Sequence, residues 1–346
     1  MDIPTLQAAK ALVLDWWKAL EHTDESKAAA ATVRAFAPDI TTYGPDPINE
    51  LRGPTAYLEQ FWQPLRHSFA GLQRQTHLFV SGYSNGRADG NRALDGRLWV
   101  SGTGVFKGLF QNDYLGLPAH GRPVEIRFGE FCEVRDGRIV SLYYLIDLVD
   151  LFEQAGVEVL PPCRGRPGLY PPPAAQDGML TAVPDVALTQ HSLEHIRRFI
   201  FDGLNAYDQS ELKSMGMADW FEADVKWYGP GGIGACLSFK EFENLHQRPW
   251  LVAFPDRQVQ DLTALFAENH YSGAPGWAGV IATHSGPYLG EPASQRRVSI
   301  NGLDWWKRDG EKYVENWVFV DMIHLFRQFG VDLMARMRER AAARNA

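Results

Sequence analysis

Residues 298–331 decide the fold of this chain, and they read VSINGLDWWKRDGEKYVENWVFVDMIHLFRQFGV. The stretch predicts a strand, a turn at Asp309-Gly310, a second strand ending at Asp321, and a short helix ending at Gly330. It therefore forms a hairpin that is joined directly to a helix.

The second predicted strand carries a row of aromatic side chains that ends in a carboxylate. Because successive side chains of a strand alternate between its two faces, Trp317, Phe319 and Asp321 are expected to project together. Val318 and Val320 are then expected to project from the opposite face. The pattern predicts a carboxylate among aromatic rings.

The same pattern occurs earlier in the chain, at residues 124–157, which read VEIRFGEFCEVRDGRIVSLYYLIDLVDLFEQAGV. Both ends of the two copies differ by the same offset, since 298 − 124 and 331 − 157 each give 174. A second pair of similar segments, FAPDITTYGP at 36–45 and FEADVKWYGP at 221–230, has an offset of 185. The chain is therefore an internal duplication.

Each copy begins with helical spacing of apolar residues and continues as strands, which is an α+β pattern. A segment rich in proline and glycine, PPCRGRPGLYPPPAAQDG, separates the copies and reads as a linker. We therefore expect one domain at 1–160, a linker at 161–185 and a second domain at 186–346.

The composition restricts the class of protein. A formal charge of -8, with no basic run, argues against binding to nucleic acid or to an anionic membrane. Three cysteines without CxxC spacing indicate neither a disulfide framework nor a cysteine-rich zinc site. The N-terminus lacks the features of a signal peptide and no apolar run is long enough to span a membrane, so a cytoplasmic protein is expected.

The second half resembles the SnoaL-like polyketide cyclases, which belong to the NTF2-like superfamily. The resemblance rests on AENHYSG, ATHSGPYLG, RDGEK and ENWVFVDMIHLFRQFG. The first half is similar through LGLPAHGRPVEIRFGEF and LYYLIDLVDLFEQAG, but it has GVFKGLF in place of THSG and Tyr143 in place of Trp317.

This resemblance implies two cone-shaped domains, each with N-terminal helices packed on a curved antiparallel sheet. It also implies a hydrophobic small-molecule substrate, no cofactor and no metal. NTF2-like domains commonly pair through their sheets, so the two halves are expected to form an intramolecular pseudo-dimer, with a further homodimer as an option.

The resemblance implies that Asp321, and Asp147 in the first half, are the acid/base carboxylates of the two sites. Burial among aromatic side chains would raise the pKa of such a carboxyl toward neutrality. The alternative is that each aspartate caps the helix that follows it. His284, within the THSG motif, is a third catalytic candidate that could hydrogen-bond a substrate carbonyl.

A two-residue turn at Asp136-Gly137 would pair Glu130 with Tyr143, and the offset of 174 then places Asp304 on the same face as Trp317 and Asp321. Tyrosines beside the Gly-Pro turns could donate to an oxyanion or could be core residues. His246 is a weaker candidate. The predicted substrate-binding residues are Trp317, Phe319, Tyr228, Trp227, Trp306, Asp304, Tyr43, Tyr143 and Glu130.

Three functions fit these features. The first is a cofactor-independent cyclase that closes a ring by an intramolecular aldol reaction or a related proton transfer. The second is an isomerase, dehydratase or hydrolase of another small hydrophobic molecule, since one fold hosts many reactions. The third is a small-molecule binding protein without catalysis.

Overall fold

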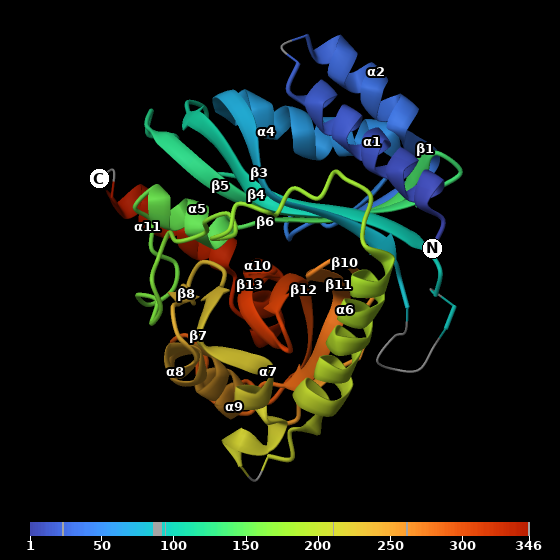
Figure 1. Ribbon diagram of the computed structural model, residues 1–346. Helices are drawn as coiled ribbons and strands as arrows, with labels where there is room; N and C mark the ends of the chain where they lie inside the picture. The colour runs from blue at the N-terminus through green and yellow to red at the C-terminus, as the bar shows by residue number, and fades with distance from the viewer. Residues whose placement is uncertain (23, 86–91, 94, 210, 261, 345–346) are drawn as a thin grey trace.

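The computed structural model describes residues 1–346 except 23, 86–91, 94, 210, 261 and 345–346. It contains two β-sheets, one from each copy of the repeat, and each sheet is covered by helices on its outer side (Figure 1). The predicted α+β class and the tandem duplication are confirmed.

The first copy begins with helices because its apolar residues recur at helical spacing. In α1, Asp2 caps the N-terminus by accepting a hydrogen bond from the Thr5 amide, and Leu6, Val13 and Trp17 are buried. The elements of this copy are α1 (Ile3–Leu20), α2 (Glu25–Ala35), β1 (Phe36–Tyr43), β2 (Glu50–Arg52), α3 (Gly53–Tyr57), the π-helix η1 (Leu58–Trp62), α4 (Gln63–Ser68), β3 (Phe69–Tyr83), β4 (Leu98–Phe110), β5 (Pro123–Arg135), β6 (Arg138–Ile146) and α5 (Leu148–Gln154).

The second copy repeats this order after the linker. Two of its helical segments are π-helices, η2 and η5, and the second lies at the position of η1 in the first copy. The elements are α6 (Val186–Arg198), η2 (Phe199–Gly203), η3 (Leu204–Ala206), η4 (Leu212–Met215), α7 (Met217–Trp220), β7 (Phe221–Tyr228), β8 (Ala235–Cys236), α8 (Phe239–Glu241), η5 (Phe242–Gln247), α9 (Arg248–Ala253), β9 (Gln258–Val259), β10 (Phe266–Glu268), β11 (Tyr271–Thr283), β12 (Arg297–Asp309), β13 (Lys312–Val320), α10 (Met322–Phe329) and α11 (Leu333–Arg344).

The strand orders of the two sheets match the duplication. The first sheet has the order β2-β1-β6-β5-β4-β3, and the second has β10-β11-β12-β13-β7-β8, with β9 paired to β11. Each sheet is antiparallel except for one parallel pair, β1 with β6 in the first and β7 with β13 in the second. Each sheet was expected to be antiparallel and instead contains one parallel strand pair.

The two sheets pack face to face and bury an apolar layer between them (Figure 1). Phe131 of the first sheet stacks on Trp305 of the second with ring centroids 4.7 Å apart. The Trp305 indole also donates a hydrogen bond of 2.9 Å to Ser101. The halves thus form the expected intramolecular pseudo-dimer.

Two segments tie the halves together beyond the sheets. In the linker, Tyr170 is buried and its hydroxyl lies 2.7 Å from the Thr103 hydroxyl. The terminal helix α11 reaches back to the first copy, where Arg336 donates to the Val159 carbonyl. We propose the domain limits 1–160 and 186–346, with the last helix of the second domain packed against the first.

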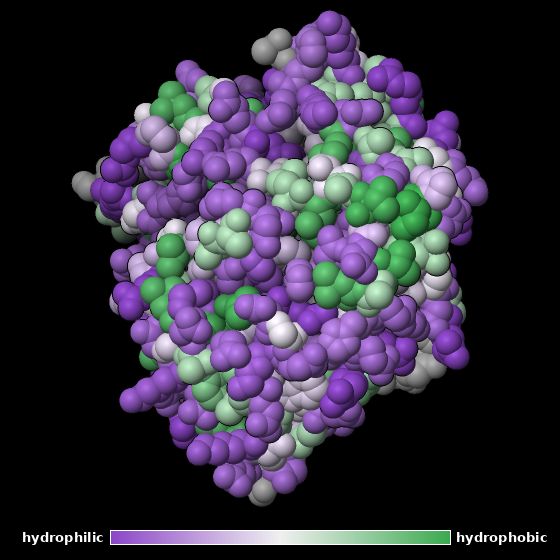
Figure 2. All heavy atoms as spheres, viewed as in Figure 1, coloured by the Kyte–Doolittle hydropathy of each residue, from purple (hydrophilic) through white to green (hydrophobic). Residues whose placement is uncertain are grey.

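The face seen in Figure 2 is mostly hydrophilic, with hydrophobic residues in separate groups. Within the described part of the chain, no helix combines the length and the apolar character that crossing a membrane requires.

Candidate functional site

The second domain contains an apolar cavity of about 180 Å³ between its sheet and its helices. The π-helices η2 and η5 both contribute to its wall, and π-helical turns are frequent at functional sites. The cavity is lined mainly by Phe199, Ile200, Leu204, Met215, Met217, Trp227, Phe242, His246, Gln247, Trp250, Arg257, Val259, Val280, Gly302, Asp304, Trp306, Asn316, Val318 and Phe319.

Asp304 is a carboxylate in the wall of this cavity. It pairs with Val318 across β12 and β13, and both side chains face the cavity. Burial raises the pKa of the Asp304 carboxyl to about 7, and a hydrogen bond from the Asn316 side chain opposes the rise. A carboxyl with this pKa exchanges protons readily at neutral pH.

His246 is a second titratable group in the cavity wall. Its ring stacks on Trp227 with centroids 4.0 Å apart. Burial lowers the pKa of the His246 imidazole to about 3, and the nearby Arg257 adds to the lowering. The imidazole is therefore neutral above pH 4 and carries one N–H donor.

The sequence patterns do not single out Asn316 or Arg257, and they indicate His246 only weakly. Asn316 lies two residues before Val318 on β13 and so projects from the same face, which means that the sequence indicates Asn316 once the strand face is known. His246 lies in η5 and Arg257 lies in the loop before β9. The spacing of residues along the sequence does not predict that these segments approach the cavity.

The predicted row of aromatic residues points to the other face of the sheet. Trp317 and Phe319 belong to the apolar layer between the two sheets, although Phe319 also borders the cavity. Trp305 pairs with Trp317, whereas Asp304 pairs with Val318. The prediction that Asp304 shares a face with Trp317 is therefore wrong.

A β-bulge explains this error. Lys307 pairs with Glu315 but Arg308 pairs with Tyr313, so Val314 is an extra residue in β13. One extra residue exchanges the faces of all side chains beyond it.

The first sheet has the equivalent bulge at Val140, since Glu133 pairs with Ser141 and Val134 with Ile139. Glu130 consequently pairs with Tyr144 rather than with the predicted Tyr143.

Asp321 lies where the two domains meet and is not among the residues lining the cavity. Its Oδ1 accepts a hydrogen bond of 3.0 Å from the His324 amide, which caps α10, and its Oδ2 accepts one of 2.9 Å from the Asp46 amide of the first domain. Burial raises the pKa of the Asp321 carboxyl to about 7, while these two amide donors lower it.

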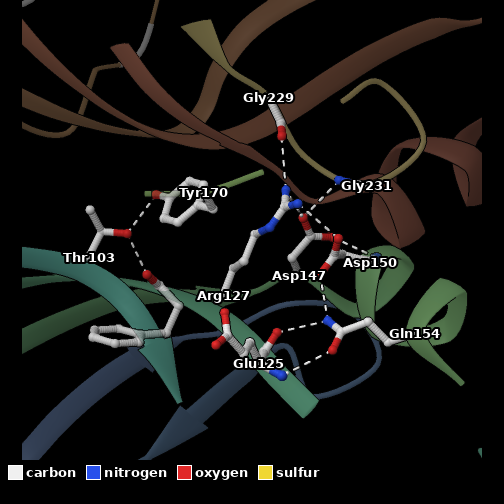
Figure 3. A network of polar contacts seen from close by, with 10 residues as sticks. Thr103, Glu125, Arg127, Asp147, Asp150, Gln154, Tyr170, Gly229 and Gly231 are labelled. Carbon is white, nitrogen blue, oxygen red and sulfur yellow. Dashed lines mark hydrogen bonds and ion pairs between the residues drawn. The ribbon is translucent and has the colours of Figure 1, made fainter. Parts of the chain in front are cut away.

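Asp147 of the first domain makes the equivalent contacts, with one of them to the second domain (Figure 3). It accepts from the Asp150 amide, which caps α5, and from the Gly231 amide of the second domain at 2.8 Å. The positions correspond by the repeat offsets, since 321 − 147 is 174 and 231 − 46 is 185. Arg127 adds bonds to Asp147 and to the Gly229 carbonyl. The two aspartates thus form a reciprocal clamp between the domains, which we call the aspartate clamp.

Replacing Asp321 with Ala is expected to lower the free energy of unfolding by about 2–3 kcal/mol, because a helix cap is lost and the buried Asp46 amide is left without an acceptor. Denaturant unfolding followed by tryptophan fluorescence measures the loss. Asp185→Ala is the matched control, because Asp185 caps α6 through the Leu188 amide and should cause a smaller loss. If Asp321→Asn stays folded but loses turnover, the catalytic role expected of Asp321 is supported instead.

The remaining predicted residues fall into separate places. His284 is buried beside α10, where its ring stacks on Phe329 at 3.8 Å and its Nδ1 contacts the Ser294 hydroxyl. Tyr228 lies against Trp317 in the layer between the sheets. Tyr43 and Tyr143 stack on each other at 4.5 Å in a surface groove.

Of the predicted residues, the structure therefore brings together Asp304, Trp227 and Trp306, with Phe319 at the edge of the cavity.

In the first domain, the position of Asp304 is taken by Glu130, since 304 − 130 is 174. Glu130 forms two hydrogen bonds of 3.0 Å with the guanidinium of Arg74, and both side chains are buried. The guanidinium also lies 4.3–4.8 Å from the ring centroids of Trp17, Phe106 and Phe128. This carboxylate is therefore paired and enclosed.

Smaller residues open the cavity in the second domain. By the offset of 185, Arg74 corresponds to Val259; by the offset of 174, Phe106 corresponds to Val280 and Phe128 to Gly302. The strand pairing supports this, because Arg74 pairs with Phe106 and Val259 pairs with Val280. All three smaller residues line the cavity.

Comparisons with known proteins find two family matches, one in each half. The family described as SnoaL-like domain matches residues 13–142, and the family described as SnoaL-like polyketide cyclase matches residues 217–329. No curated protein matches the chain.

Three solved structures illustrate the structural likeness. IdmH of Streptomyces antibioticus, described as a candidate polyketide cyclase, is 22% identical, covers 43% of this chain and 99% of its own, and has a TM-score of 0.34. AclR of Streptomyces galilaeus, described as a candidate hydroxylase, is 22% identical, with coverages of 41% and 97% and a TM-score of 0.34. TsrD of Streptomyces laurentii is 22% identical, with coverages of 42% and 97% and a TM-score of 0.32.

Proposed function

Because the chain is a tandem pair of SnoaL-like domains of the NTF2-like superfamily, we propose that its second domain is a cofactor-independent acid–base enzyme. Its reaction is proton transfer at carbon on a small hydrophobic carbonyl compound, including the aldol-type ring closure of a polyketide-like substrate. The single observation that supports this is Asp304, a carboxyl with a pKa of about 7 in the wall of an apolar cavity.

The proposed chemistry uses one carboxyl group twice. Ionised Asp304 removes a proton from the carbon next to a carbonyl, which leaves an enolate and a protonated carboxyl. The enolate carbon attacks a second carbonyl of the same molecule, and the resulting alkoxide takes the proton back from Asp304. Neutral His246 supplies an N–H that can hydrogen-bond the carbonyl oxygen while negative charge develops on it.

The cavity size limits the substrate. At about 180 Å³ it is close to the roughly 150 Å³ of an apolar protein cavity that admits benzene. The part of the substrate that the cavity encloses is therefore about one ring in size, and Trp227 and Trp306 provide flat surfaces for it.

The first domain is proposed to be a structural partner. Its carboxylate Glu130 is bound to Arg74, so it does not have the free proton-accepting oxygen that the reaction needs. An isomerase or dehydratase would use the same Asp304 chemistry on a different small carbonyl compound.

The pH dependence of proton exchange tests the proposal. Monocyclic 1,3-diketones and cyclic enones in D₂O serve as probes, and NMR measures deuterium incorporation at carbon above the uncatalysed rate. Since ionised Asp304 is the base, kcat/KM is expected to rise about tenfold per pH unit up to a midpoint near 7 and then to level off.

A midpoint near the ordinary carboxyl value of 3.8 would contradict the assignment. Saturable binding of the probes without any exchange would instead indicate a binding protein.

A further inference from the structure

Two surface grooves flank the layer between the sheets, and the duplication relates them. The first, here called the linker groove, is formed by Lys226, Lys307, Asp309, Val314 and Glu315, by Asp224, His270 and Arg308, and by linker residues 174, 175 and 177. The second, here called the open groove, encloses about 390 Å³ and is formed by Thr41, Glu133, Arg135, Val140 and Ser141, with Tyr43, Tyr143, Trp277, Arg97 and Thr263. Thr41 corresponds to Lys226 by the offset of 185. By the offset of 174, the residues Glu133, Arg135, Val140 and Ser141 correspond to Lys307, Asp309, Val314 and Glu315.

The linker groove holds a proline-rich segment of the same chain, in which Pro171–Pro173 are followed by a turn where the Gln176 amide donates to the Pro173 carbonyl at 2.9 Å. The Trp317 indole donates to the Pro171 carbonyl at 2.9 Å, and the Ala174 amide donates to Glu315 at 3.0 Å. The carboxylate of Asp177 then accepts from Lys307 at 2.8 Å. The three prolines restrict the backbone of the free segment, so less conformational entropy is lost when the segment is bound.

Two tyrosines add further contacts to this segment. The Tyr271 hydroxyl donates to Asp177 at 2.6 Å. The linker's own Tyr170 packs against Phe319 and lies close to Arg127 (Figure 3). Backbone amides, carbonyls and one acidic side chain are all recognised.

The open groove offers the same kinds of group at the corresponding positions. Tyr143 replaces Trp317 as a donor, Ser141 replaces Glu315 as an acceptor, and Arg97 replaces Tyr271 as the donor to a carboxylate, each by the offset of 174. Arg97 already pairs with Glu133 at 3.3 Å, and Arg135 adds a second positive charge to this groove.

Aromatic rings complete the open groove. Trp277 of the second domain lies 5.6 Å from Tyr143 and 6.2 Å from Tyr43 of the first. All three rings are partly exposed, and aromatic-lined grooves are the usual binding surface for extended proline-rich segments. The part of the chain that the structure describes places no linker segment here.

We propose that the open groove binds a proline-rich segment of a partner protein in which a short turn separates the prolines from an acidic residue. The prolines pack on Tyr43, Tyr143 and Trp277. The acidic side chain pairs with Arg97 and Arg135. The proposal does not depend on the catalytic assignment of Asp304.

Fluorescence anisotropy with the full chain tests this proposal. The probe is a fluorescein-labelled peptide, GLYPPPAAQDG, which copies residues 168–178. Saturable binding is expected, and replacing its three prolines with glycines should weaken binding, because the free peptide then has more conformational freedom to lose.

Two groove variants and one control locate the site. Trp277→Ala and the exposed-surface variant Arg135→Glu are each expected to weaken binding by about tenfold or more. Arg122→Glu is the matched control, because Arg122 is also exposed and lies beside the opposite end of β5. Absence of saturable binding would overturn the proposal. Equal affinity of the wild type and Arg135→Glu would also overturn it, because the peptide would then occupy the linker groove or another surface.

Discussion

Replacing Asp304 with Asn is expected to lower the kcat/KM of carbon-bound deuterium exchange by about 10²–10⁴-fold at pH 8. The amide has nearly the same shape as the carboxyl, so the cavity keeps its volume and its aromatic walls. It cannot accept a proton at this pH, and the ionised carboxyl is the base in the proposed reaction. NMR detection of deuterium on the diketone and enone probes measures the loss.

Asp309→Asn is the matched control for this variant. Asp309 lies on the same strand, β12, but is exposed at its end and outside the cavity, so its replacement should leave the exchange rate unchanged. A folded Asp304→Asn protein that exchanges deuterium at the wild-type rate would contradict the assignment and leave Asp321 as the candidate base.

The same variant is expected to be more stable than the wild type above pH 7. The folded-state pKa of Asp304, about 7, lies above the ordinary value of 3.8, so the ionised form destabilises the fold. This destabilisation grows as the pH rises from about 4 to 7 and is absent in the amide, which corresponds to about 2–4 kcal/mol at pH 8. A gain in stability that accompanies a loss of exchange would distinguish a functional carboxylate from a structural one.

The duplication made most of the fold predictable. Constant offsets of 174 and 185 reveal two copies without any structural information, and each copy ends with the strand–Asp–helix junction seen at Asp147 and Asp321. The alternative that these aspartates are helix caps was therefore available from the sequence. Their second contacts, to the Gly231 and Asp46 amides, join residues 84 and 275 positions apart and follow no local pattern.

The candidate site was only partly predictable because strand register decides which residues face the cavity. Asp304, Trp227 and Trp306 were predicted and do line it. Trp317 was predicted with them but faces the other sheet, because the bulge at Val314 adds one residue after the turn. Val314 carries no sequence signal for a bulge.

The pairing of Glu130 with Arg74 was equally invisible in the sequence, since the two residues come from β5 and β3, which the intervening strand β4 separates. It distinguishes the two domains and can be tested directly. Arg74→Leu is expected to lower the free energy of unfolding by about 3–5 kcal/mol at pH 7, because it leaves the buried Glu130 carboxylate without its cation.

The double variant Arg74→Leu/Glu130→Leu is expected to recover most of that loss, because no uncompensated charge remains and both replacements are apolar. Arg52→Leu is the control: Arg52 pairs with Glu50 on the surface, where its side chain is 82% exposed, so its removal should change stability by less than about 1 kcal/mol. Denaturant unfolding of the three variants measures the differences. A double variant no more stable than Arg74→Leu would show that the volume of Arg74 among Trp17, Phe106 and Phe128 is what stabilises the first domain. Recovery would show that the loss in Arg74→Leu comes from the uncompensated charge of Glu130 and not from the lost packing of Arg74.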